Sequence, residues 1–213
     1  KTMDTSKKNI INCSFGLKCS FQDPETDSEE MVAHYKAVYK DVVTPLETVM
    51  NLFENTDTTI IASTGNNDGD DSTYPAALDL DHVIGVGSLG IEGIENSNSA
   101  LYKRASYSNT TKRTLYDPET EELYVVTDGF YAPGGMIRDP GEDPKVTSVK
   151  KGLFGVYIGA EYTEIHNPDA PVYAFWCGTS FAAPLVTGVF ANLYRAYNRV
   201  EVKDMLKNLE DHL

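Results

Sequence analysis

The sequence predicts an α/β fold in which a mostly parallel sheet is flanked by helices. Two observations support this prediction: nearly continuous apolar runs bounded by turn-forming residues, and a stretch with helical periodicity between two of these runs. Continuous apolar strands are typical of parallel sheets, whose two faces are both covered. The 213 residues, 41% of them hydrophobic, suffice for one domain over residues 1–213 and are too few for two large ones.

The N-terminal half supplies two strands and the helix between them. A buried strand is expected over residues 8–14, followed by a polar loop over 17–28. Apolar residues then recur at helical spacing from Met31 to Phe53. A kink or break is expected near Val43, because Pro45 lacks a backbone N–H. The β-branched run over 58–63 predicts the second strand.

The remaining elements complete the predicted α/β pattern. A further strand is expected over 83–87, a surface hairpin over 112–127, a long loop over 133–152 and a short strand over 154–158. Helices are expected over 179–197 and 202–213, at the C-terminal end of the chain.

Charge and hydropathy exclude two classes of partner. The net charge is −14, so the surface repels nucleic acid and anionic lipid. No apolar run approaches the ~20 residues that a membrane span needs. The three cysteines are too few for a disulfide framework, although Cys13 and Cys19 could pair in a secreted protein.

The most specific segment is Gly178-Thr179-Ser180-Phe181-Ala182-Ala183-Pro184-Leu185-Val186-Thr187-Gly188. It places a serine at the start of a predicted helix, where free N–H groups and the helix dipole favour a negative charge. An oxyanion that forms when Ser180 attacks a carbonyl would be stabilised there. The alternative is that Ser180 only caps a buried helix, since serine is a common N-cap.

This segment resembles the nucleophile motif of the subtilisin-like serine protease (subtilase) family, and every fixed position of that motif is met. Three further segments occur in the family's order: residues 9–16, residues 63–67, and residues 74–76 followed by 83–87. Ala132-Pro133-Gly134 also matches a family landmark. The resemblance implies the C-terminal part of a three-layer subtilisin-like domain that lacks its N-terminal elements.

The resemblance also implies roles for individual residues. Ser180 would be the nucleophile, and the Asn66 amide and the Ser180 N–H would bind the oxyanion. One wall of the pocket for the substrate's P1 side chain would be Ser14, Phe15 and Gly16, and the other wall would be Thr64 and Gly65. The substrate would be a peptide or protein, the chemistry would need no cofactor, and the location would be secreted or otherwise extracytoplasmic.

The chain departs from the family pattern at the other two catalytic residues. The family's aspartate and histidine motifs precede the strand at residues 8–14, and neither motif occurs here. None of the four histidines precedes Gly-Thr or Gly-Ser, and His166 is a weak substitute in a polar segment. A serine without a base is a poor nucleophile. We therefore expect an upstream segment, cleaved or outside this chain, to supply both residues and to associate tightly with it.

Cys177 and five aspartates lie near the predicted nucleophile and the predicted oxyanion residue in the sequence. Cys177 precedes the motif and is interpreted as a buried structural thiol rather than a reactive one. Five acidic residues near Asn66 could form a solvated loop or a structural calcium site: Asp68, Asp70, Asp71, Asp79 and Asp81. Two functions besides an active peptidase also remain, namely an inactive subtilisin-like scaffold that binds peptides or partners, and an unrelated α/β binding domain.

Overall fold

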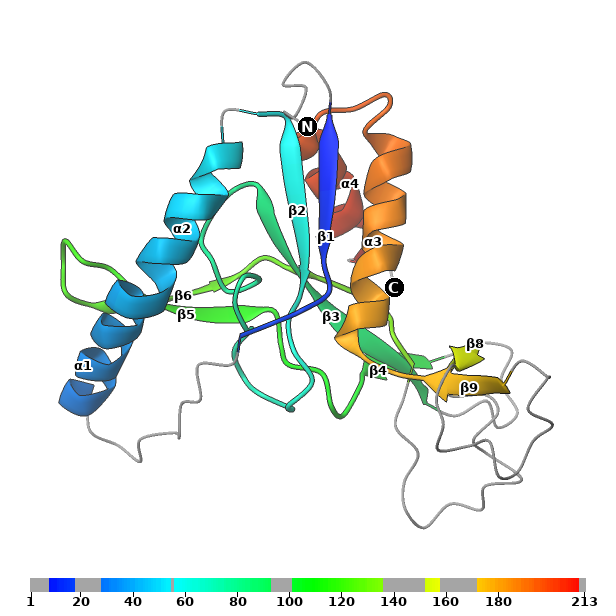
Figure 1. The fold of residues 1–213 in the computed structure, drawn as a ribbon, viewed down its shortest axis with the longest axis horizontal. Helices are drawn as coiled ribbons and strands as arrows, with labels where there is room; N and C mark the ends of the chain where they lie inside the picture. The colour runs from blue at the N-terminus through cyan, green and yellow to red at the C-terminus, as the bar shows by residue number, and fades with distance from the viewer. Residues whose placement is uncertain are drawn as a thin grey trace, which may run out of the picture.

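A central sheet organises the residues that the structure, a computed structural model, describes: 8–17, 28–54, 56–92, 101–135, 152–157 and 172–210 (Figure 1). Its strands are β1 (Asn9–Cys13), β2 (Thr58–Ser63), β3 (Val83–Glu92), β4 (Leu101–Arg104) and β7 (Phe130–Pro133). β1, β2, β3 and β7 run parallel, and β4 runs antiparallel to β3. The mostly parallel sheet predicted from the apolar runs is confirmed, and β3 is longer than expected.

Strand β2 is the most deeply buried part of the sheet. All six of its residues are buried, and it pairs with β1 on one side and β3 on the other. Its side chains alternate between two cores, as the two-residue period of a strand requires. Ile61 belongs to one core, whereas Ile60 and Ala62 belong to the other. Helices therefore cover both faces of the sheet, which explains why the run is continuously apolar.

Helices α3 (Thr179–Leu193) and α4 (Arg199–Glu210) cover one face of the sheet. Ala182 and Ala183 are fully buried, so these small residues bring the start of α3 close to the strands. Phe190 of α3 and Val202 of α4 complete this core. Helix α3 ends at Leu193, four residues before the predicted end, and α4 begins at Arg199, before the predicted start at residue 202.

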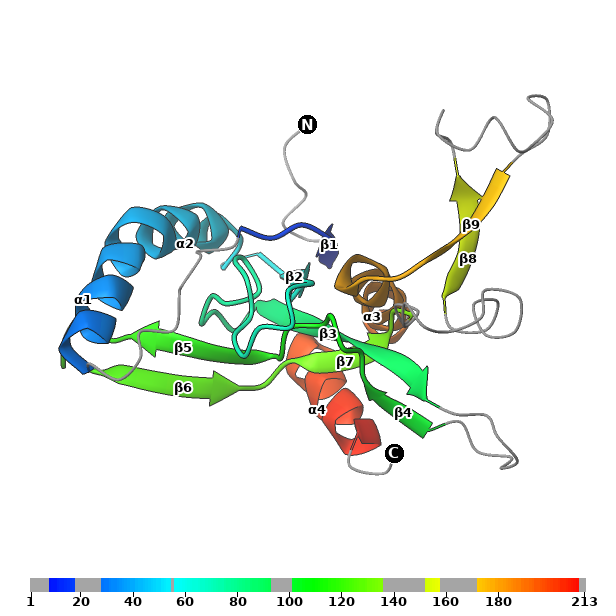
Figure 2. The ribbon, with the colours of Figure 1, turned by 90° about the horizontal axis from the view of Figure 1, so that it is seen from below.

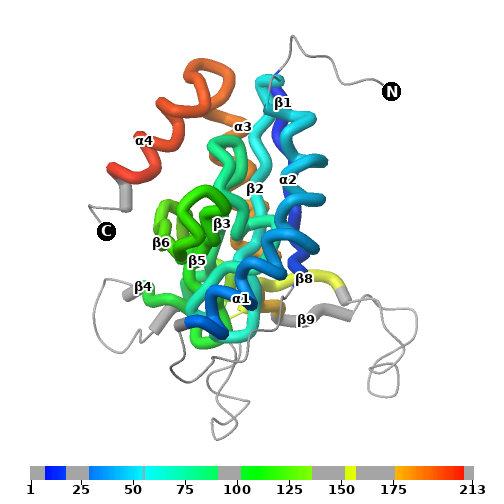
Figure 3. The backbone as a smooth tube through the Cα atoms, turned by 90° about the vertical axis from the view of Figure 1, so that its left-hand side faces the viewer, coloured from blue at the N-terminus to red at the C-terminus, as the bar shows by residue number. Residues whose placement is uncertain are grey.

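The opposite face is covered by a continuous helical segment. It consists of α1 (Ser28–Val38), a π-helical turn (Tyr39–Val43), α2 (Thr44–Met50) and a 3-10 turn (Asn51–Phe53). The side view places this segment in front of the sheet and α4 away from it (Figure 3). The irregularity predicted near Val43 is confirmed. The missing Pro45 N–H coincides with a widened turn instead of a break, and the Thr44 N–H bonds to the Tyr39 carbonyl.

Two antiparallel hairpins lie at opposite ends of the molecule (Figure 2). The predicted hairpin is confirmed as β5 (Lys112–Tyr116) and β6 (Leu123–Thr127), which lies beside α1. The predicted strand at 154–158 is β8 (Leu153–Tyr157), and its partner β9 (Val172–Trp176) leads into α3. Most of the two predicted loops, namely residues 18–27 and 136–151, lies outside the described residues.

Strand β1 lies at one edge of the sheet. Among the described residues it pairs with β2 alone, so no described strand adjoins its outer edge. Leu185 and Val189 of α3, the helix that lies beside β1 (Figure 1), are 46% and 42% exposed.

In the part of the chain that the structure describes, no helix is both long and apolar enough to cross a membrane.

Candidate active site

Three segments that are far apart in the sequence meet at the carboxyl ends of the parallel strands. Ser14 directly follows β1, Gly65 and Asn66 follow β2, and Ser180 is the second residue of α3. The carboxyl edge of a parallel sheet is the usual place for a binding site in an α/β fold. The structure therefore brings together the predicted nucleophile, the predicted oxyanion residue and the start of one predicted pocket wall.

Ser180 is tied to Ser14 by two reciprocal hydrogen bonds. The Ser180 hydroxyl donates to the Ser14 carbonyl oxygen over 3.0 Å, and the Ser14 hydroxyl donates to the Ser180 carbonyl oxygen over 3.1 Å. Pro184 explains the second bond, because it has no N–H to donate to the carbonyl four residues earlier. The Ser14 hydroxyl supplies the hydrogen bond that the helix itself cannot make.

The start of α3 can stabilise a negative charge that forms near Ser180. Ser180 lies in the first turn, so its N–H has no acceptor within the helix. Gly178 lies directly before the helix and has a φ angle of 155°, a conformation that other residues rarely adopt. A Cβ atom at Gly178 would also lie 3.3 Å from the Asn66 side-chain nitrogen. Glycine at this position therefore lets Asn66 approach the helix start.

The orientation of Asn66 follows from its hydrogen bonds. The backbone N–H and the hydroxyl of Thr179 both donate to Asn66 Oδ1, each over 2.9 Å. Because the Thr179 N–H can only donate, the amide oxygen must face Thr179. The Asn66 NH₂ group is then on the other side of the amide. Thr179 is fully buried and also accepts the Gly65 N–H over 3.3 Å, so it fixes the β2 loop, residues 64–71, to α3.

The residues of the two predicted pocket walls lie on either side of Thr73. A Cβ atom at Gly16 would lie 2.2 Å from the Thr73 hydroxyl oxygen, and a Cβ atom at Gly65 would lie 2.8 Å from the Thr73 methyl carbon. Phe15 is 62% exposed, whereas Thr64 is fully buried and donates its hydroxyl to the Asn109 carbonyl oxygen. Sequence reasoning missed Thr73, whose place between the walls depends on tertiary contacts.

The structure describes two of the four histidines, His34 and His82, and neither is a base for Ser180. His82 is buried and its Nε2 contacts the Met50 carbonyl oxygen. His34 lies on α1, and its ring makes an edge contact with Tyr35. Both lie with the helices on the face opposite α3. His166 and His212 lie outside the described residues.

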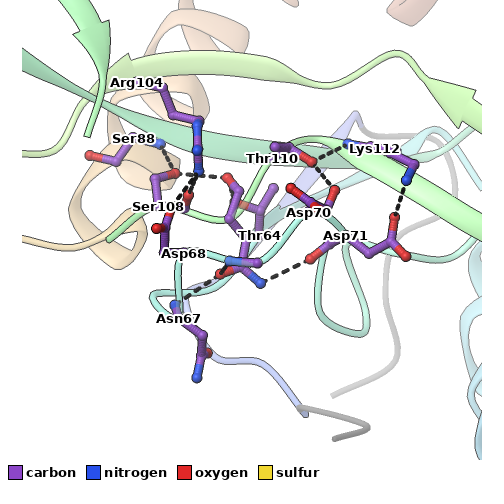
Figure 4. A network of polar contacts seen from close by, with 12 residues as sticks. Thr64, Asn67, Asp68, Asp70, Asp71, Ser88, Arg104, Ser108, Thr110 and Lys112 are labelled. Atoms are coloured by element: carbon purple, nitrogen blue, oxygen red, sulfur yellow. Dashed lines mark hydrogen bonds and ion pairs between the residues drawn. The ribbon is translucent and has the colours of Figure 1, made fainter. Parts of the chain in front are cut away.

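The carboxylates of the β2 loop are largely paired with cations (Figure 4). Asp68 lies 3.1 Å from Arg104, and Asp71 lies 3.6 Å from Lys112. Asp79, further along the chain, lies 3.5 Å from the buried Arg113. Among the described residues, no group of three or more His, Cys, Asp or Glu side chains is placed to hold a metal ion. The ion pairs of Asp68, Asp71 and Asp79 brace this part of the chain, and the alternative of a structural calcium site stays a prediction.

Cys177 is a half-buried free thiol beside the helix start, and burial raises its pKa. Cys13 is a buried free thiol, and Cys19 lies outside the described residues. A raised pKa leaves less thiolate at pH 7 than in an exposed cysteine, so Cys177 is a poor nucleophile.

If the full-length protein is a peptidase, we expect Cys177→Ala to leave its activity within about threefold of the wild type. Iodoacetamide should alkylate Cys177 slowly in the folded protein at pH 7, and faster as the pH rises above 9. Mass mapping of the alkylated peptide measures this rate, and the unfolded protein serves as the control. Rapid alkylation at pH 7, or a tenfold loss of activity in the alanine variant, would contradict this interpretation.

The parallel sheet, the serine at the start of α3 and the fixed Asn66 amide lie together at this edge, and serine hydrolases use such a combination. The chain belongs to the subtilase family, since the family model described as Peptidase S8, subtilase family, matches residues 3–211. It is therefore part of a subtilase-family protease domain, and the fold expected from the motifs is confirmed. No curated protein matches the chain.

Three solved structures illustrate the likeness. A protease from Pseudoalteromonas arctica PAMC 21717 has 20% identity and a TM-score of 0.50, over 94% of this chain and 43% of that one. The epidermin leader peptide processing serine protease (EpiP) from Staphylococcus aureus has 19% identity and a TM-score of 0.48, over 93% and 43%. The prenylagaramide maturation protease PagA has 23% identity and a TM-score of 0.46, over 92% and 49%. The chain thus spans less than half the length of each.

Proposed function

We propose that this chain carries the nucleophile half of a subtilisin-type serine endopeptidase. Ser180 attacks the scissile carbonyl and forms an acyl-enzyme, which water then hydrolyses. The Asn66 NH₂ group and the Ser180 N–H stabilise the oxyanion of each tetrahedral intermediate. The observation that carries this proposal is the double hydrogen bond from Thr179 to Asn66 Oδ1, because it leaves the amide NH₂ as the end available to an oxyanion beside Ser180.

The base is proposed to come from a segment upstream of Lys1 that bears the family's aspartate and histidine. The Ser180 hydroxyl now donates to the Ser14 carbonyl, so a histidine must redirect that hydrogen bond before Ser180 becomes nucleophilic. The outer edge of β1 and the partly exposed Leu185 and Val189 of α3 offer this segment a strand partner and an apolar surface. Secretion, which the family suggests, belongs to the same proposal.

The coding sequence upstream of Lys1 gives the first test of this proposal. It should contain an Asp-Thr-Gly or Asp-Ser-Gly motif followed by a His-Gly-Thr motif, in that order. The full-length product, freed of any inhibitory pro-segment, should then hydrolyse peptides. An upstream sequence without either motif would contradict the peptidase and favour an inactive scaffold that binds peptides.

We also propose that Thr73 limits the size of the substrate side chain that fits between the two walls. Ser14, Phe15 and Gly16 form one wall, and Thr64 and Gly65 contribute the other mainly through their backbone. The Thr73 side chain is 7% exposed and fills the space between Gly16 and Gly65. Small or narrow P1 side chains should therefore be preferred over large aromatic ones.

Replacing Thr73 with glycine should open this space. We expect the ratio of kcat/KM for phenylalanine to kcat/KM for alanine at P1 to rise by about tenfold or more, since a few added carbon atoms in a pocket have effects of this size. Thr73→Val is the matched control, because it keeps the volume and removes only a hydroxyl that has no hydrogen-bond partner among the described residues. Equal ratios in the wild type and the glycine variant would contradict the assignment.

A further inference from the structure

Asn109 lies next to the β2 loop in space although it is far from it in the sequence. It lies between β4 and β5, about forty residues after the loop, and only 4% of its surface is exposed. A buried amide side chain requires hydrogen-bond partners. Within the part of the chain that the structure describes, this amide has three hydrogen-bond partners, and all are backbone groups of the β2 loop.

The Asn109 side chain binds the loop on the C-terminal side of Asn66. Its Oδ1 accepts the N–H of Asn67 over 2.9 Å and the N–H of Gly69 over 3.2 Å. Its Nδ2 donates to the carbonyl oxygen of Asp71 over 2.9 Å. One side chain thus fixes the direction of three peptide groups, starting with the residue next to Asn66.

The Asn109 backbone binds the loop on the N-terminal side of Asn66. The Asn109 N–H donates to the Gly65 carbonyl oxygen over 3.0 Å, and the Asn109 carbonyl accepts the Thr64 hydroxyl over 3.2 Å. Asn109 therefore contacts the residues on both sides of Asn66. The Asn66 side chain also accepts two bonds from Thr179, and Asp68, two residues further on, donates its N–H to the Tyr107 carbonyl oxygen over 2.9 Å.

The loop is shaped to admit the Asn109 side chain. A Cβ atom at Gly65 would lie 3.0 Å from Asn109 Nδ2, and one at Gly69 would lie 2.9 Å from it. Gly65 has φ +114, which favours glycine on its own account. Glycines on both sides of Asn66 thus permit the close approach that the three side-chain hydrogen bonds need.

The segment that carries Asn109 is itself braced against the sheet. The Ser108 hydroxyl accepts the Ser88 N–H of β3 over 2.8 Å and donates to the Asn109 carbonyl over 2.8 Å. Figure 4 shows Ser88, Ser108 and Arg104 close together, with Arg104 paired to Asp68 of the β2 loop. A movement of the Asn109 backbone would therefore disturb the hydrogen bonds that join Ser108 to Asn109 and to β3.

We infer that Asn109 is a positioning residue that holds the β2 loop so that the Asn66 NH₂ group faces the oxyanion. This inference rests on the proposed function, because it assumes that Asn66 binds the oxyanion. Asn109 is not itself a catalytic residue, since its side-chain partners are backbone groups of the loop. Replacing Asn109 should therefore lower kcat, because the Asn66 amide is needed in the transition state. It should leave KM nearly unchanged, because substrate binding does not need that amide.

The test measures kcat and KM of the full-length protein for one peptide substrate. Asn109→Leu replaces the side chain with one of similar size and removes its three hydrogen bonds. It is expected to lower kcat at least tenfold, with KM within about threefold of the wild type. The double variant Asn66→Ala/Asn109→Leu should be no less active than Asn66→Ala, within about threefold, because Asn109 acts through Asn66.

Asn198→Leu is the matched control for a merely structural effect. Asn198 Oδ1 also accepts a backbone N–H, that of Glu201, at the start of α4 and away from the site. This variant should lower the melting temperature and leave kcat unchanged. If Asn109→Leu does not fold, Asn109→Asp keeps both accepting contacts and loses the bond to Asp71, and its kcat should fall by about threefold to tenfold.

The outcomes separate the two proposals. A kcat loss in Asn66→Ala together with wild-type kcat in Asn109→Leu, or in Asn109→Asp where the leucine variant does not fold, would overturn the positioning role and leave the proposed function intact. Additive losses in the double variant would also overturn it. Unchanged kcat in Asn66→Ala would overturn the oxyanion assignment and this inference with it.

Discussion

Replacing Ser180 with alanine is expected to reduce kcat of the full-length protein by about 10⁴-fold or more, with little change in KM. Loss of the nucleophile costs about 10⁶ in subtilisin, a member of this family. The alanine variant should fold normally, because it loses the one hydrogen bond from the Ser180 hydroxyl to the Ser14 carbonyl. The bond from Ser14 to the Ser180 carbonyl does not need that hydroxyl.

The measurement compares turnover of a peptide substrate by Ser180→Ala, the wild type and Ser106→Ala. Ser106 is an exposed serine in the turn between β4 and β5, so its loss should leave kcat unchanged. Activity above about 1% of the wild type in Ser180→Ala would show that another group performs the attack. In that case the half-buried Cys177 would be the next residue to test.

Asn66→Ala is expected to lower kcat by about 10²–10³-fold with KM nearly unchanged. This is the loss known for removing the equivalent donor from subtilisin itself, and the hydrogen bonds of Asn66 in this chain give a structural reason to expect it here. Thr179 holds Asn66 Oδ1 with two donors, so the NH₂ group is oriented before any substrate arrives. Such preorganisation stabilises charge that develops only in the transition state.

Asn67→Ala is the matched control for this second prediction. Its side chain points away from the polar network in Figure 4, and its contribution to the loop is a backbone N–H that the substitution keeps. This variant should retain wild-type kcat and KM. An Asn66→Ala variant that raises KM and keeps kcat would contradict an oxyanion role and indicate ordinary substrate binding.

The parts of the fold that the sequence predicts are those with strong local patterns. The buried strand β2, the helix over α1 and α2 and the hairpin β5–β6 each follow from periodicity or turn chemistry. Pro45 predicts a kink or break near Val43, and the structure has a widened turn at Tyr39–Val43, because the N–H that proline lacks interrupts the regular hydrogen bonds of the helix there. Strands β4, β7 and β9 have four or five residues, too few for a clear sequence pattern, and β7 pairs with β3, a strand far from it in the sequence.

The candidate site shows the same division. The sequence motifs identify Ser180 and Asn66, and the structure brings both to one edge of the sheet. Thr73 and Asn109 were missed, because threonine before Tyr-Pro and asparagine after serine are ordinary loop residues in the sequence. Their importance comes from tertiary contacts: Thr73 lies between Gly16 and Gly65, and Asn109 binds both sides of Asn66. Both residues stay predictions until their variants are measured.

Labelling with a fluorophosphonate probe tests the central claim most directly, since this probe reacts only with an activated serine. It should be applied to the full-length protein, to its Ser180→Ala variant and to residues 1–213 alone. We predict strong labelling of the full-length protein, none in the variant, and little in residues 1–213 without the upstream aspartate and histidine. A folded full-length protein, free of any pro-segment, that stays unlabelled would contradict the peptidase and favour an inactive subtilisin-like scaffold.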